Sequence, residues 1–120
     1  MTLWQSIINS LELKLETSPE TVRRKVAGAY CGDLLSDVLA RAEQGDIWIT
    51  IHRHRSVIAV ASLLNLSGVV VTGSRKPDQD TLEAAETEGI PLFTTRLDNF
   101  QASGRLYGII FSTGKDKKNQ

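Results

Sequence analysis

The chain has 120 residues with 14 basic and 14 acidic side chains, so its formal net charge is zero with histidine neutral. A chain of this length forms one domain that buries roughly 65% of its unfolded surface, and its apolar runs are shorter than the roughly 20 residues of a membrane-spanning helix. Its single cysteine excludes an internal disulfide and any metal site built from several thiolates. The N-terminus has no basic and apolar secretion signal, so we expect a cytoplasmic protein with no membrane partner.

The first half of the chain predicts a helix and two strands before the next helix. Apolar spacing indicates a helix over 3–11 and strands over 11–15 and 26–31. A second helix over 34–42 follows, for which we expect Asp33 as the N-cap and Gly45 as the C-terminal stop.

The second half predicts strands and helices in regular alternation. The expected order is a strand over 46–51, a helix over 54–65, a strand over 68–72, a helix from 77 to 88, a strand over 90–93 and a helix over 97–102. The continuous apolar run 68–72 is typical of a central parallel strand covered on both faces. This alternation predicts an α/β fold, with a single domain over 1–114 and a mainly parallel sheet of about five strands flanked by helices. The polar tail 115–120 is expected to be disordered.

Polar residues gather in the loops that follow the strands, where open parallel sheets bind their ligands. These candidate ligand-binding residues are Asp33, Thr50, His52, Thr72, Gly73, Ser74, Arg75, Thr94 and Thr95. Hydroxyls, free backbone N–H groups and an arginine there could hold an anionic small ligand, such as a phosphate. The alternative interpretation is structural, because threonines cap helices and glycines form turns without any ligand.

Other side-chain pairs suggest metal or acid–base chemistry only weakly. His52 and His54 could both face a metal ion, but the arginines that alternate with them would repel a cation, so we expect no metal and no cofactor. Asp33 and Asp37 lie four residues apart, as an acid–base pair could. We expect instead that Asp33 caps the helix and that Asp37 is a solvated carboxylate in its first turn.

Basic and aromatic residues could together bind nucleic acid, but the overall charge argues against this partner. Trp48 and Tyr107 occupy apolar runs, so we expect both in the core rather than stacked on bases. We also expect Cys31 to be a buried strand residue rather than a nucleophile.

The segment 108–116 looks like a phosphate-binding loop but departs from it at three points. Five residues rather than four separate Gly108 from Gly114, Asp116 replaces the hydroxyl residue that holds magnesium, and too little chain follows for a helix. Because no nucleophile elbow or zinc-protease motif occurs either, we expect no catalytic residues and no enzymatic activity.

The run LSGVVVTGSRKPDQDTLEAAETEGIPLFTTRLDNFQASGRLY, residues 66–107, resembles the DRTGG domain. The matching features, in order, are the strand end Val71-Thr72-Gly73, Pro77 before a helix, the turn Glu88-Gly89-Ile90-Pro91, and Thr94-Thr95 before Phe100. Residues 26–30, 33–38 and 45–50 resemble the first half of the same domain. Ser74 stands where the family's T-G-G corner has its second glycine.

The resemblance implies an α/β regulatory or assembly module without catalytic residues of its own. DRTGG domains are similar to the N-terminal domain of HPr kinase/phosphorylase and occur between the CBS domains of some pyrophosphatases. We therefore expect a homodimer with a protein partner, and exposed apolar residues at Leu3, Trp4, Ile7 and 106–111 favour the same conclusion. The alternative is a sensor of nucleotide or phosphate at the carboxyl edge of the sheet.

Overall fold

The computed structural model describes residues 2–111, so the predicted tail over 115–120 and the last three residues of the predicted domain lie outside the described residues. The elements are α1 (Leu3–Ser10), β1 (Lys14–Leu15), the 3-10 helix η1 (Pro19–Thr21), β2 (Gly28–Cys31), α2 (Leu35–Arg41), β3 (Asp46–Thr50), α3 (Ser56–Leu64), β4 (Gly68–Val71), α4 (Gln79–Glu88), β5 (Leu92–Thr94) and α5 (Asn99–Ile110).

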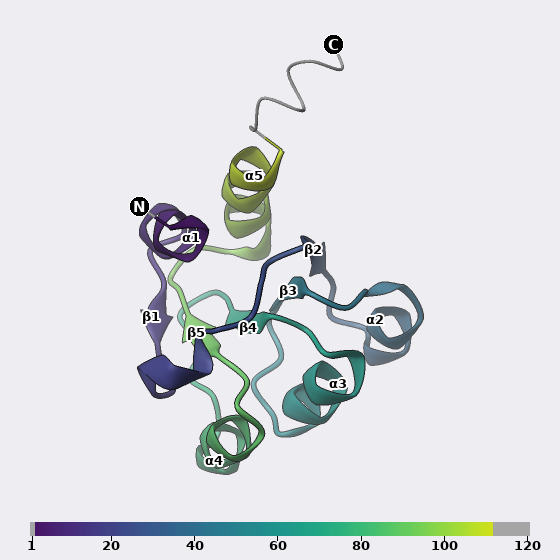
Figure 1. Ribbon diagram of the computed structural model, residues 1–120. Helices are drawn as coiled ribbons and strands as arrows, with labels where there is room; N and C mark the ends of the chain where they lie inside the picture. Colours follow the sequence, from purple (N-terminus) through teal and green to yellow (C-terminus); the bar gives the residue numbers. More distant parts are fainter. Residues whose placement is uncertain (1, 112–120) are drawn as a thin grey trace.

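The five strands form one sheet in the order β1-β5-β4-β3-β2. The strands β2 to β5 are parallel, and the two-residue β1 pairs with β5 in the antiparallel direction. Helices α2, α3 and α4 cover one face of the sheet, and α1 and α5 cover the other (Figure 1). The predicted α/β fold with a mainly parallel sheet is confirmed, and the apolar run of β4 lies at the centre of the sheet as expected.

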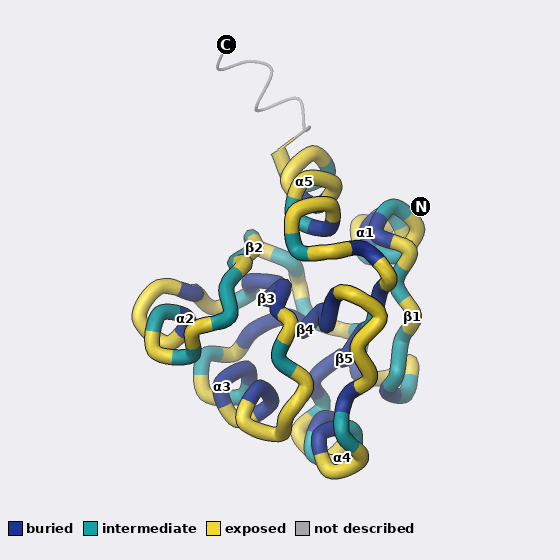
Figure 2. The backbone as a smooth tube through the Cα atoms, turned by 180° about the vertical axis from the view of Figure 1, so that it is seen from behind, coloured by how far each residue is buried: buried dark blue, intermediate teal, exposed yellow. Residues whose placement is uncertain are grey.

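Side chains of the central strands alternate between two apolar clusters. Trp48 packs with the residues of α2, α3 and α4, whereas Ile47 and Ile49 pack with those of α1 and α5. Every residue of β3 and β4 is buried, and the exposed residues lie on the helices, the loops and the edge strands β1 and β2 (Figure 2). The prediction that Trp48 lies in the core is confirmed, and its indole N–H donates to the carbonyl of Gly32 at 2.8 Å.

The last helix is longer than the sequence predicted. Asp98 and Gln101 form a capping box that starts α5, and Ala102 and Leu106, one turn apart, are both buried against the sheet. This packing carries the helix through Gly104, so the predicted end at residue 102 is wrong. Within residues 2–111, no helix is both long and apolar enough to cross a membrane.

Candidate functional site

The carboxyl ends of β2, β3 and β4 are joined by a hydrogen-bond network centred on Asp33. The Asp33 carboxylate accepts from the Thr50 hydroxyl and the Ile51 amide, both at 2.8 Å. Its other oxygen accepts from the side-chain amide of Asn99 at 3.1 Å, and the oxygen of that amide accepts from the Thr72 hydroxyl. Four segments distant in sequence are therefore fixed to one another at this edge.

The predicted role of Asp33 as a helix cap is wrong. The N-cap of α2 is Leu34, which makes no side-chain cap hydrogen bond, because the Asp33 carboxylate is turned toward the strand ends instead. The prediction for Asp37 is partly right. It lies in the first turn of α2, where it also accepts hydrogen bonds from Tyr30 and Arg41, and these bonds lower its pKa.

His52 and His54 point to different partners, so the structure does not bring them together. The His52 ring nitrogen Nε2 bonds the backbone carbonyl of Asp33, and His54 Nδ1 lies 2.6 Å from the Asp78 carboxylate. The bond to His54 lowers the pKa of Asp78. No group of three or more potential metal ligands is found in the part of the chain that the structure describes.

A second group of predicted residues lines a cleft of about 350 Å³ beside β5 and β1. The cleft is lined by Glu12, Lys14, Glu16, Ser74, Arg75, Lys76, Thr94, Thr95 and Arg96. Arg96 forms a bidentate ion pair with Glu12, with Nε and Nη2 each 2.8 Å from a carboxylate oxygen. The hydrogen bonds from Arg96 and Arg105 lower the pKa of Glu12. Within residues 2–111, neither Arg75 nor Lys76 has a carboxylate partner at ion-pair distance. The cleft therefore carries an excess of positive charge.

The corner between β4 and α4 shapes one wall of this cleft. Gly73 and Ser74 both have a positive φ, at 73° and 57°. Their amides donate to the carbonyls of Leu97 and Thr95, at 2.8 and 2.9 Å. These two N–H groups are thus not free for an anion, and a ligand in the cleft would meet side chains such as Arg75 instead.

Thr94, the last residue of β5, and Thr95, which follows it, are both held by hydrogen bonds within the protein. The Thr94 hydroxyl donates to Glu16 at 2.7 Å, and the buried Thr95 hydroxyl donates to the carbonyl of Leu11 at 2.7 Å. Asn99 belongs to the network around Asp33 and Lys14 lines the cleft, but neither residue was predicted. The only signal for Asn99 was a polar residue after β5 at the start of α5, and Lys14 reaches the edge because β1 pairs antiparallel with β5.

Part of the apolar surface predicted for self-association is exposed, including Tyr107 and Phe111 of the segment 106–111, and part of it is buried. Ile7 and Leu106 are fully buried in the core, whereas Leu3 is 44% exposed. Tyr107 and Cys31, predicted as buried, are exposed. Both expectations failed because β2 is the edge strand and nothing in the described chain covers the outward side of α5.

The sequence profile of the DRTGG domain matches residues 10–109. This chain belongs to the DRTGG domain family. The DRTGG corner at Thr72, Gly73 and Ser74 is the turn described above, and Ser74 takes the glycine-like conformation although it is not glycine.

A solved structure of the CBS and DRTGG domains from the regulatory region of Clostridium perfringens pyrophosphatase, complexed with its activator diadenosine tetraphosphate, resembles this DRTGG domain with a TM-score of 0.70. The two sequences are 24% identical, and the match covers 94% of this chain and 48% of that chain. The present chain thus spans about half the length of that protein, and the likeness establishes the shared fold. A comparison with the curated proteins gives no match.

Proposed function

We propose that this DRTGG domain is a cytoplasmic, non-catalytic regulatory module that self-associates and modulates a partner protein. The observation that carries the proposal is the outward face of α5, where Phe100, Tyr107 and Phe111 are 86%, 67% and 46% exposed. Gly104 and Gly108 share this face, which contains no charged residue. A contiguous exposed apolar patch of this kind is typical of an interaction surface.

Two further observations support a regulatory rather than a catalytic role. The polar groups at the carboxyl edge bond to one another, as Asp33 does to Thr50 and Asn99, rather than converging on a position for a reacting atom. The similar pyrophosphatase domain belongs to a regulatory region.

Sedimentation equilibrium over a concentration series tests the self-association. We expect a mass of twice 13.2 kDa at tens of micromolar. A mass of 13.2 kDa at every concentration would contradict the proposal.

A second candidate function is the binding of a phosphate-bearing small ligand in the cleft beside β5. The observation that favours it is the pair of cations, Arg75 and Lys76, which have no carboxylate partner in the described chain. Unpaired cations at a concave surface attract anions. The activator of the similar pyrophosphatase is a tetraphosphate, which is an anion of this class.

Thermal unfolding with pyrophosphate, ATP or diadenosine tetraphosphate tests this candidate. A ligand at a hundred times its Kd stabilises the folded state by roughly 2.7 kcal/mol. We expect Arg75→Ala and Lys76→Ala to remove the shift, and Arg55→Ala, an exposed cation outside the cleft, to retain it. If none of the three compounds raises the unfolding temperature, this second candidate is wrong.

A further inference from the structure

The outer edge of the sheet at β2 is open. Within residues 2–111, β2 pairs only with β3. The amide of Gly32, directly after β2, donates to the carbonyl of Ile49 in β3 at 3.1 Å. Because alternate residues of a parallel strand bond the same neighbour, the backbone groups of Ala29 and Cys31 point away from the sheet. Proteins usually protect such an edge with proline, a charge or a bulge, but the strand Gly-Ala-Tyr-Cys has none of these.

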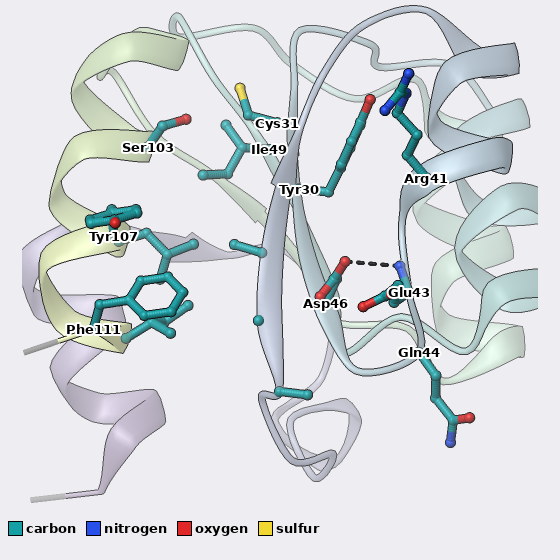
Figure 3. Close-up of a pocket in the computed structure, with 15 residues that line it drawn as sticks. Tyr30, Cys31, Arg41, Glu43, Gln44, Asp46, Ile49, Ser103, Tyr107 and Phe111 are labelled. Carbon is teal, nitrogen blue, oxygen red and sulfur yellow. Dashed lines mark hydrogen bonds between the residues drawn. The ribbon is translucent and has the colours of Figure 1, made fainter. Parts of the chain in front are cut away.

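A groove of about 510 Å³ follows this edge on both faces of the sheet. Ser103, Tyr107 and Phe111 line it on the α5 side of β2, and Tyr30, Arg41 and Asp46 line it on the α2 side (Figure 3). The edge strand separates the two halves, so one compact small molecule could not fill both. A strand added alongside β2 would reach both.

One polar atom in this groove lacks a partner. The Ser103 hydroxyl is buried and has no hydrogen bond in the described part of the chain. Buried polar atoms are nearly always satisfied in a complete assembly. A partner that covers the groove would not reach this hydroxyl, because the domain itself already shields its oxygen from solvent.

The exposed stripe of α5, formed by Phe100, Gly104, Tyr107, Gly108 and Phe111, borders the same edge. The rings of Tyr107 and Phe111 lie 4.7 Å apart and line the groove. A Cβ atom added at Gly104 or Gly108 would meet no other atom within 4 Å, so another helix could approach closely there. The strand edge and the α5 stripe thus form one continuous surface.

We propose that this surface joins two copies of the chain, with β2 pairing antiparallel to β2 of the second copy about a two-fold axis. The proposal rests on the self-association proposed above and identifies its interface. A two-fold axis perpendicular to the sheet at the β2 edge places both α5 helices on the same face, beside each other. Their stripes supply area that a four-residue strand lacks, since stable interfaces bury about 800 Å² per partner.

The charges around β2 favour a second copy as the occupant. Three basic residues, Arg23, Arg24 and Lys25, precede the strand. Asp33 and Asp37 follow it, and Asp37 also pairs with Arg41 of its own chain. Antiparallel pairing places the basic end of each copy beside the acidic end of the other, at both ends of the interface. Parallel pairing would place like charges together.

Light scattering on variants tests this interface. Ala29→Pro removes an outward N–H, which a strand edge tolerates, and Tyr107→Asp places a charge on the α5 stripe. We expect each variant to have half the mass of the wild-type protein. Leu63→Asp is the matched control, because Leu63 is 71% exposed on α3, on the opposite face of the sheet, and should leave the dimer intact.

The outcomes separate this interface from self-association itself. A monomeric wild-type protein contradicts both proposals. If the wild-type protein is dimeric and a folded Tyr107→Asp or Ala29→Pro variant is also dimeric, this interface alone is overturned. The same holds if the wild-type protein is dimeric and the Leu63→Asp control dissociates. If circular dichroism shows that Ala29→Pro is unfolded, Cys31→Lys replaces it, because an edge lysine blocks strand addition and should give a monomer.

Discussion

Ser74 holds a backbone conformation that glycine adopts more easily. Its φ of 57° lies in the left-handed region, which costs a residue with a Cβ atom about 1 kcal/mol or more. Glycine would remove this cost but would also increase the entropy of the unfolded chain. We therefore expect Ser74→Gly to raise the free energy of unfolding by less than about 1 kcal/mol, measured by urea denaturation.

Gly73→Ala is the matched control for this corner. A Cβ atom at Gly73 would lie 2.2 Å from Nη1 of Arg75, and the φ of 73° disfavours alanine independently. We expect this variant to lose stability. Destabilisation by Ser74→Gly would contradict the view that the left-handed φ of Ser74 is strained.

Asp33 contributes to stability through its three side-chain contacts. Asp33→Ala would leave the buried hydroxyl of Thr50 and the side-chain amide of Asn99 without their acceptor. Leaving buried polar groups unpaired costs about 1–3 kcal/mol, and we expect a loss in that range in chemical denaturation. Asp80→Ala, an exposed aspartate in the first turn of α4, is the control and should change stability little. Equal losses for the two variants would show that the network is not stabilising.

At the scale of elements, the Tyr30 hydroxyl joins β2 to α2 by donating to Asp37. This bond raises the pKa of Tyr30, whereas bonds from Tyr30 and Arg41 lower the pKa of Asp37. The stabilisation is thus lost as pH falls through the lowered pKa of Asp37, and again as pH rises through the raised pKa of Tyr30. We expect Tyr30→Phe to be less stable than the wild type near neutral pH, with a difference that shrinks at both extremes. A difference independent of pH in urea denaturation would contradict this account.

Asp46 is the first residue of β3, and partial burial of its charged carboxylate destabilises the folded state. Burial raises the pKa of its carboxyl, although it accepts a bond from the Glu43 amide at 2.9 Å. A raised pKa means that stability falls as pH rises from the usual aspartate pKa through the raised one. Asparagine keeps the acceptor without the charge, so we expect Asp46→Asn to unfold at a higher temperature near neutral pH and to lose this advantage in acid. An advantage that persists in acid would contradict the assigned cause.

The sequence predicts helices and strands best where the apolar pattern and the packing agree. The run 68–72 was recognisable as the central strand because both its faces are buried in the sheet. The carboxyl-edge residues could be listed because parallel strands end at one edge. Their contacts could not be predicted, since the choice of Asp33 between capping α2 and bonding Thr50 depends on how far apart the strand ends lie. The exposure of Tyr107 was missed for a similar reason, because an apolar run does not reveal which side of α5 has no neighbour.

At the scale of the whole molecule, the two faces of the sheet are covered but its two edges differ. One edge ends in the two-residue β1, beside the basic cleft. The other ends in β2, whose outward backbone groups and flanking α5 stripe are open. Because the two surfaces lie at opposite edges, anion binding and self-association could take place in the same protein.

Amide hydrogen exchange of the wild-type protein at two concentrations tests whether two copies of the chain associate through β2 and α5. We predict that the amides of Ala29 and Cys31 exchange more slowly at the higher concentration, while exposed amides of α3 do not change. If the protein sediments as a dimer but the amides of Ala29 and Cys31 exchange fast at both concentrations, that result would contradict pairing through β2.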